Sequence, residues 1–96
     1  MENKIIIIPE DTKNYVESLH YEVESRKDLL SFALSKGYKS NDSFKEYEKE
    51  YKEFFIQYEA AKKNIENMFV KKMYPNVIKW ELNFETCEIT INIPDN

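Results

Sequence analysis

The chain has 96 residues and a formal net charge of −4, and 42% of its residues are hydrophobic. This length predicts a single domain, residues 1–96, with a modest core. The hydrophobic content excludes a disordered chain, and the acidic balance argues against a nucleic-acid binder, which normally carries a basic face. The N-terminal apolar run is too short for a signal peptide, and no segment is long enough to cross a membrane, so we expect a cytoplasmic protein without membrane attachment.

The first predicted elements are a short strand and a long helix. Residues 4–8 contain four consecutive isoleucines and are followed by Pro9, a pattern typical of a strand buried on both faces. Pro9 suits the first turn of a helix, and the two acidic residues after it favour the positive end of the helix dipole. The sequence therefore predicts a helix over residues 11–36, which ends at Gly37 in a left-handed cap.

A second, longer helix is expected over residues 43–74. Ser43 and Glu46 form a capping box at its start, and Pro75 stops it. Both helices carry a stripe of mostly apolar residues at alternating steps of three and four, the pattern of a coiled-coil seam. The stripes are Val16, Leu19, Val23, Arg26, Leu30, Ala33 in the first helix and Phe44, Tyr47, Tyr51, Phe54, Tyr58, Ala61, Ile65, Met68, Lys72 in the second.

The two stripes also match each other in register. A short linker makes the helices antiparallel neighbours, and facing residues then have numbers that add up to 80 or 81, as for Arg26 and Phe54. In this register small residues face large ones, for example Ala33 and Tyr47. That size match was not used to choose the register, so it supports a helical hairpin independently.

The C-terminal part predicts a β-hairpin over residues 77–93. Apolar and polar residues alternate there with a break at Glu85-Thr86, which indicates a one-sided antiparallel sheet. A two-residue turn at the break would make Phe84 and Cys87 neighbours across the strands. Glu-Thr is a poor sequence for such a tight turn, so a longer or bulged loop is the alternative. The other predicted apolar pairs are Leu82–Ile89, Trp80–Ile91 and Ile78–Ile93.

Together these elements predict an α+β fold: a long antiparallel two-helix coiled-coil hairpin with a small antiparallel β-sheet. The sheet would contain the C-terminal hairpin and the N-terminal strand.

The residue types that support catalysis or metal binding are scarce. Metal sites need several ligands at set spacings, and the chain has one cysteine, Cys87, and one histidine, His20. They are far apart in the sequence, and His20 lies outside the seam. We therefore expect no catalytic, cofactor-binding or metal-binding residues, and we interpret Cys87 as a small, inward-facing strand residue.

Arg26 is the exception in the seam, and it is the only arginine in the chain. The register places it opposite Phe54 and between Tyr51 and Tyr58, where a guanidinium can stack on an aromatic ring. A structural role, with the stem covering the seam and the head reaching water, is favoured over recognition of a ligand or partner.

Three stretches together resemble a family of small bacterial proteins that accompany peptide-modification systems for cysteine-repeat (CXXX) peptides and their radical-type maturases. These stretches are ESRKDLLSFAL, FKEYEKEYKEFFIQY and KWELNFETCEITI, of which the phrase WELNFETCE is the most distinctive. The resemblance implies an accessory protein in a peptide-maturation system. It implies no catalytic residue.

The leading functional hypothesis is a non-enzymatic interaction protein that forms a dimer. Seven large apolar residues outside the seam exceed what two helices can bury, and two hairpins could cover them as a four-helix bundle: Tyr15, Leu29, Phe32, Leu34, Phe55, Ile56 and Phe69. The alternatives are a peptide-binding adaptor that uses a sheet edge and a small phage-type inhibitor of a host protein. The candidate interaction residues are Arg26, Tyr51, Phe54, Tyr58, Phe55, Phe69 and Trp80.

Overall fold

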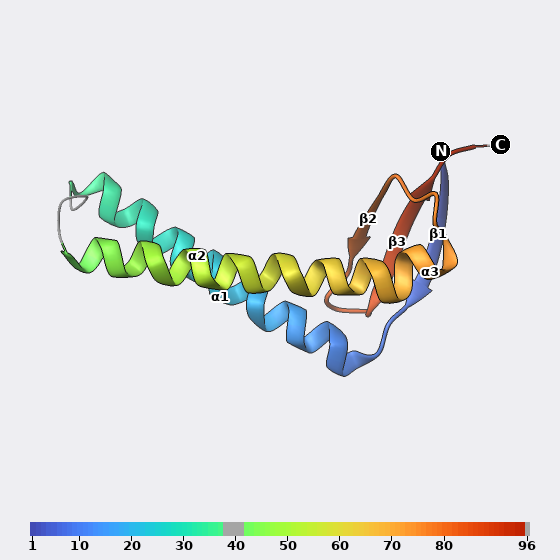
Figure 1. Cartoon of the computed structure of the whole chain (residues 1–96), viewed down its shortest axis with the longest axis horizontal. Helices are drawn as coiled ribbons and strands as arrows, with labels where there is room; N and C mark the ends of the chain where they lie inside the picture. Colours follow the sequence, from blue (N-terminus) through green and yellow to red (C-terminus); the bar gives the residue numbers. More distant parts are fainter. Residues whose placement is uncertain (38–41, 96) are drawn as a thin grey trace. The chain divides into compact units, whose positions relative to one another are not determined.

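The computed structural model describes residues 1–37 and 42–95 and has an α+β fold (Figure 1). The described residues fall into two compact units. The helical unit is residues 18–60, and the sheet unit is residues 1–17 with the chain from residue 61 onward. In chain order the elements are β1 (Glu2–Ile7), α1 (Glu10–Ser35), α2 (Asp42–Ile65), the π-helical turn η1 (Glu66–Val70), α3 (Lys71–Met73), β2 (Lys79–Leu82) and β3 (Glu88–Ile93).

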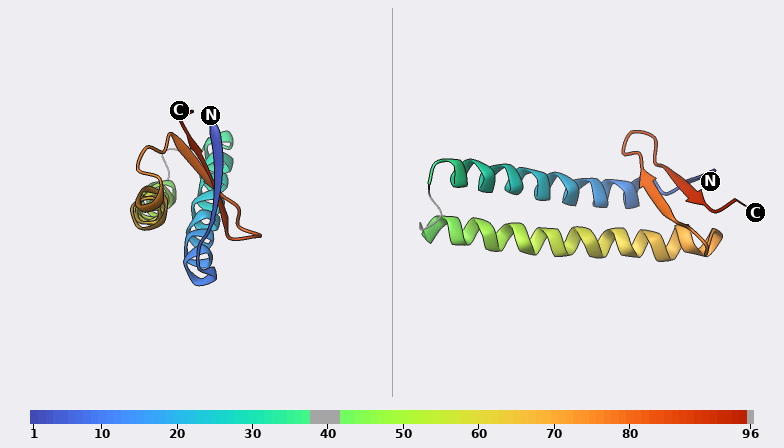
Figure 2. Two further views of the ribbon diagram at one scale, coloured as in Figure 1. Left: turned by 90° about the vertical axis from the view of Figure 1, so that its right-hand side faces the viewer. Right: turned by 90° about the horizontal axis from the view of Figure 1, so that it is seen from above.

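The predicted helical hairpin is confirmed in the helical unit, where α1 and α2 run antiparallel and side by side (Figure 2). The predicted seam residues Leu19, Val23, Ala33 and Phe44 are buried. Gly37 has a φ of 77°, and its N–H donates to the carbonyl of Leu34 over 3.1 Å, which confirms the left-handed end of α1.

Both helix boundaries shift slightly from those predicted. Helix α1 begins and ends one residue earlier than residues 11–36, and α2 begins at Asp42. Ser43 therefore lies inside the first turn of α2, and the position that would cap this helix lies outside the described residues.

The sheet unit contains one antiparallel sheet with the strand order β1-β3-β2 (Figure 1). The N-terminal strand joins the C-terminal hairpin as predicted. Strand β3 is central, and its inward residues Ile89 and Ile91 are fully buried, as are Ile65 and Val70 at the end of the second helical segment. The hairpin has the predicted register, with Trp80 opposite Ile91 and Leu82 opposite Ile89. The predicted pair Ile78–Ile93 is wrong, because β2 begins at Lys79 and Ile78 is 57% exposed.

The prediction of an N-terminal strand buried on both faces is wrong. Strand β1 spans Glu2–Ile7 rather than residues 4–8, and Ile5 and Ile7 are 61% and 72% exposed. The reason is that β1 is an edge strand of a one-sided sheet, so alternate isoleucines face solvent. Ile8 is buried beyond the strand end, where its N–H donates to the carbonyl of Cys87 over 3.0 Å.

The predicted Phe84–Cys87 strand pair is also wrong, and the longer-loop alternative holds. Asn83 N–H donates to the Glu88 carbonyl over 2.8 Å, and Cys87 N–H donates to the Asn83 carbonyl over 3.0 Å, so Phe84–Cys87 form the loop. The Asn83 side chain accepts a further bond from the N–H of Glu85 over 2.8 Å. Because Glu-Thr suits no tight turn, the backbone reverses over four residues, and the positive φ of 62° falls on Cys87.

The second seam departs from the prediction at Tyr47, which is 36% exposed, and again after Ile65. Met68 and Lys72 are exposed, whereas Val70, outside the predicted stripe, is completely buried. The cause is η1, where the N–H of Lys71 donates to the carbonyl of Glu66, five residues earlier. This π-helical turn inserts one residue into the helix and moves the buried stripe. The helical stretch ends at Met73, one residue before the predicted end, ahead of Pro75.

Candidate interaction surface

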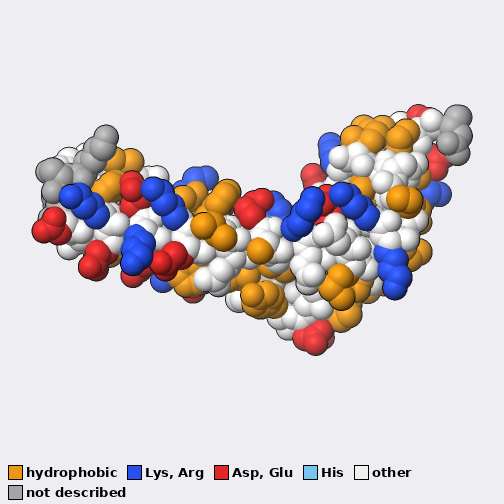
Figure 3. Space-filling view, in the orientation of Figure 1, with side chains coloured by type: hydrophobic (Ala, Val, Ile, Leu, Met, Phe, Trp, Pro, Cys, Tyr) orange, Lys and Arg blue, Asp and Glu red, His pale blue; other side chains and the backbone are white. Residues whose placement is uncertain are grey.

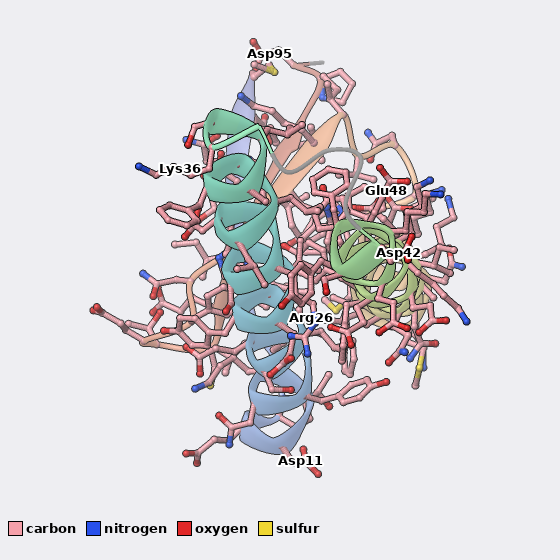
Figure 4. The ribbon with its side chains drawn as sticks, turned by 90° about the vertical axis from the view of Figure 1, so that its left-hand side faces the viewer. Asp11, Arg26, Lys36, Asp42, Glu48 and Asp95 are labelled. Atoms are coloured by element: carbon pink, nitrogen blue, oxygen red, sulfur yellow. The ribbon has the colours of Figure 1, made fainter. Side chains whose placement is uncertain are left out.

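Arg26 lies on the side of α1 that faces α2, in the middle of the helical unit (Figure 4). Its guanidinium carbon is 4.2 Å from the centre of the Phe54 ring, which confirms the predicted stacking. Its charge is balanced by Glu22 on the same helix and by Glu50 on α2, 3.5 Å from Nε. A stacked arginine contributes about 0.5–2 kcal/mol, and each partly exposed ion pair contributes about 0–1 kcal/mol.

The Arg26 side chain is 25% exposed, and its Nε is buried without a hydrogen bond among the described residues. Glu50 approaches Nε closely enough for an ion pair, although the geometry is too poor for a hydrogen bond. The head group is thus occupied by Phe54 and two carboxylates of its own chain. This arrangement favours the structural interpretation of Arg26 over recognition of a partner.

The other predicted interaction residues of α2 surround this contact. Tyr51, Phe54 and Tyr58 are half-buried, and Tyr58 lies 5.7 Å, ring centre to ring centre, from His20 on α1. Phe55 is 42% exposed, and its ring is tilted by 31° against that of Tyr51, with ring centres 6.0 Å apart. Three of these aromatic rings therefore belong to the hairpin seam, and Phe55 is the exposed one of the four.

Trp80 and Phe69, the remaining predicted residues, lie in the sheet unit and are half-buried. The indole N–H of Trp80 on β2 donates to the carboxylate of Glu66 over 3.2 Å. Lys63 and Lys71 lie 3.2 Å and 3.6 Å from the same carboxylate. The hydrogen bond from Lys63, then that from Trp80, lowers the pKa of Glu66 below its ordinary value of 4.5.

Glu66 was not among the residues predicted from the sequence. The spacing of Lys63 and Glu66 is a usual helical ion pair, and it was the only local signal for this residue. Its bond to Trp80 depends on how β2 packs beside η1, which spacing along the chain does not specify. Glu66 opens the π-helical turn, so its carboxylate ties the irregular turn to the sheet.

Several large apolar side chains are exposed on the helices. Of the seven large residues predicted to lie outside the seam, only Phe69 is half-buried. The exposed ones are Tyr15, Leu29, Phe32, Leu34, Phe55 and Ile56, and the structure adds Tyr21. Charged side chains of both signs are interleaved along the visible surface (Figure 3). On α2, Glu48 and Lys52 form an i,i+4 ion pair, 3.3 Å apart.

A second exposed surface is the outer edge of β1. The N–H of Ile8 points toward β3, and alternate residues of an antiparallel strand direct their main-chain groups to the same side. Ile5 and Ile7 therefore direct their N–H and carbonyl groups away from β3. Within residues 1–37 and 42–95 no strand pairs with that edge.

No group of three or more potential metal ligands occurs among the described residues. Within the same residues no helix is long and apolar enough to span a membrane. Comparison with known protein families, curated proteins and solved structures returned no match.

Proposed function

We propose that this protein is a non-enzymatic accessory protein that self-associates through its helical unit and acts in the cytoplasm with a system that modifies cysteine-repeat peptides. The observation that carries the proposal is the set of large apolar side chains exposed on α1 and α2. The link to peptide modification rests on the resemblance of residues 15–91, above all the phrase WELNFETCE.

The exposed apolar residues support self-association because they are too many for an isolated hairpin. A two-helix seam covers one face of each helix, and Leu29, Phe32 and Ile56 lie outside it. Clusters of this kind on a soluble protein mark interaction surfaces. Association of two hairpins into a four-helix bundle covers such residues with side chains of the same type.

The charged clusters serve the fold of each unit rather than catalysis. Arg26 stacks on Phe54 and pairs with two carboxylates, and Glu66 holds Trp80 and two lysines. In both clusters the charged group is engaged in joining two elements of its own unit. Neither presents an acid and a base of its own to a substrate.

Sedimentation equilibrium from about 1 to about 200 µM tests self-association. We expect a monomer–dimer equilibrium with a dissociation constant in this range. A chain that stays monomeric throughout would contradict the proposal.

Calorimetric titration with a synthetic peptide of repeated CXXX units, and with the same peptide in scrambled order, tests the link to peptide modification. Equal heats for both peptides would remove that link.

The outer edge of β1 favours a second candidate function, the capture of an extended peptide by strand addition. Ile5 and Ile7 expose both their side chains and their outward main-chain groups. The variant Ile5→Pro removes an outward N–H and leaves the ladder to β3 intact, because Ile5 does not donate to β3. If the edge binds a peptide, Ile5→Pro abolishes binding and the amides of Ile5 and Ile7 exchange more slowly in the wild-type complex. An unchanged affinity would contradict this candidate.

A further inference from the structure

The outward face of α1 carries five residues in a single row, which we name the α1 outer stripe: Ser18, Tyr21, Ser25, Leu29 and Phe32. Their spacings of three, four, four and three place them on one face of the helix, away from the seam. All five are exposed, with Tyr21 at 62%, Leu29 at 41% and Phe32 at 57%. The sheet unit contributes no residue to this stripe.

The stripe is symmetric about Ser25. Tyr21 and Leu29 lie four residues to either side of it, and Ser18 and Phe32 lie seven residues to either side. When an antiparallel copy of α1 is laid along it, Ser25 meets Ser25 of the second copy and Tyr21 meets Leu29. The small side chain of Ser18 in one copy then faces the large ring of Phe32 in the other. Small and large side chains therefore match at both ends of the stripe, two large apolar side chains meet on each side of its centre, and the small serines allow close approach at the axis.

We propose that a second copy of this chain docks on the α1 outer stripe, with the two α1 helices antiparallel about a two-fold axis at Ser25. The inference rests on the proposed self-association and identifies its surface. A two-fold dimer requires a patch that is complementary to itself, and this stripe meets that requirement in both spacing and side-chain size. An unrelated partner would require no such symmetry.

The amount of apolar surface also suits a second copy. Tyr21, Leu29 and Phe32 each expose on the order of 100 Å², so the six side chains of a dimer bring together roughly 600 Å². This apolar area is about half of the ~1,200 Å² of a small specific interface, and polar residues beside the stripe would have to supply the rest. Lys36 lies at the rim, with its Nζ 5.7 Å from the centre of the Phe32 ring.

The first experiment compares two neighbouring substitutions by sedimentation equilibrium. Phe32→Glu places a charge in the stripe, and Leu34→Glu places one at a similarly exposed residue, 52%, on another face of the same helix. We expect Phe32→Glu to raise the dissociation constant at least tenfold and Leu34→Glu to change it by less than about threefold. The opposite order would overturn the inference. Circular dichroism verifies that both variants keep their helix content.

The second experiment tests the two-fold axis by cross-linking in a Cys87→Ala background. Closely packed helices with axes about 8–10 Å apart bring facing Cα atoms to roughly 4–6 Å, which a disulfide can span. We therefore expect Ser25→Cys to form a covalent dimer under mild oxidation. Ser31→Cys is the matched control, because Ser31 is an exposed serine of α1 outside the stripe. In the proposed dimer its two copies are about 18 Å apart along the helix axis.

The outcomes separate this inference from the proposed function. A wild-type dimer with no Ser25→Cys cross-link, or with equal cross-linking at Ser31→Cys, would overturn the α1 stripe and leave self-association standing. A monomeric wild-type chain would overturn both. If the wild type is a dimer, if Phe32→Glu dissociates it and if Ser25→Cys cross-links it, both the self-association and the α1 outer stripe as its surface are supported.

Discussion

Arg26 illustrates how a charged residue is accommodated in an apolar seam. Its guanidinium stacks on Phe54, and its charge is balanced by Glu22 and Glu50, yet Nε is buried and has no hydrogen-bond partner within residues 1–37 and 42–95. An unsatisfied buried donor costs about 1–3 kcal/mol, which offsets most of what the stacking and ion pairs contribute. The net contribution of the charge is therefore close to zero, although the stem fills space between the helices.

We predict that Arg26→Met leaves the free energy of unfolding unchanged or raises it by up to about 1 kcal/mol, because methionine keeps the packing on Phe54 and removes the unsatisfied donor. Arg26→Ala should lower it by about 1–2 kcal/mol, since the packing is lost as well. Urea unfolding of both variants measures these changes. A loss above about 2 kcal/mol for Arg26→Met would show that the charge itself stabilises the hairpin.

The carboxylate of Glu66 makes stability depend on pH. Its pKa is below 4.5 in the folded chain because Lys63, Trp80 and Lys71 favour the charged form. A group with a lowered pKa contributes stability above its unfolded value and loses that contribution as the pH falls through its folded value. We predict that acidification from about pH 6 to about pH 3 destabilises the wild type more than Glu66→Gln, whose amide oxygen still accepts from Trp80. Equal acid sensitivity in urea melts at several pH values would refute this role.

Cys87 affects stability through its backbone conformation rather than through its thiol. Its φ of 62° lies in the left-handed region, which costs a non-glycine residue about 1–2 kcal/mol. We therefore predict that Cys87→Gly raises the thermal unfolding temperature and that Cys87→Val lowers it, because a β-branched residue fits this conformation worst. Cys87→Ala is the control, and it should lie between them. A stabilising Cys87→Val would mean that side-chain packing outweighs the backbone here.

At the scale of elements, periodic patterns were the most informative part of the sequence. The heptads of α1 and α2 predicted the hairpin and the Arg26–Phe54 contact, since side chains three and four residues apart share a helix face. Alternation likewise predicted the register of β2 and β3. These signals are local, and each is repeated over several turns or residue pairs.

The failures have a common physical origin in tertiary context. Ile5 and Ile7 have high strand propensity, but this propensity does not distinguish a central strand from an edge strand. The π-helical turn at Glu66–Val70 accompanies the burial of Val70 and the bond between Glu66 and Trp80, and none of these leaves a periodic signal in the sequence. The site residues Arg26 and Phe54 could be predicted because they lie in a repeat, whereas Glu66 could not.

The π-helical turn offers a direct test at this scale. Deleting Asn67 from η1 leaves Val70 four residues after Ile65, so both residues still face the core in a regular α-helix. We predict that this deletion costs less than about 2 kcal/mol and keeps the Glu66–Trp80 bond, because Glu66 precedes it. Deleting Glu53 from α2 is the control, since it moves every later seam residue of that helix off its face. Equal destabilisation of both variants in urea melts would show that the inserted residue is itself required.

For the whole molecule, the distribution of burial separates the two units. The largest fully buried side chains of the part of the chain that the structure describes lie in the sheet unit: Ile65, Ile89, Ile91 and Val70. The seam of the helical unit combines buried residues such as Leu19, Val23 and Phe44 with half-buried aromatic rings, and the unit also carries an exposed apolar stripe. A chain of 96 residues buries a limited fraction of its surface. A second copy would therefore add most buried apolar surface, and so most stability, to the helical unit.

If a second copy stabilises the helical unit, thermal stability should rise with protein concentration. If the native chain is a dimer and the unfolded chain a monomer, a hundredfold increase above the dissociation constant adds about 2.7 kcal/mol per dimer, or half of that per chain. For a domain of this size the unfolding temperature should then rise by between about 5 and about 11 °C. Calorimetry of the wild type, Phe32→Glu and Leu34→Glu measures the shift, and Phe32→Glu should lose it while Leu34→Glu keeps it. An unfolding temperature independent of concentration in the wild type would mean that the exposed stripe contributes nothing to stability through self-association.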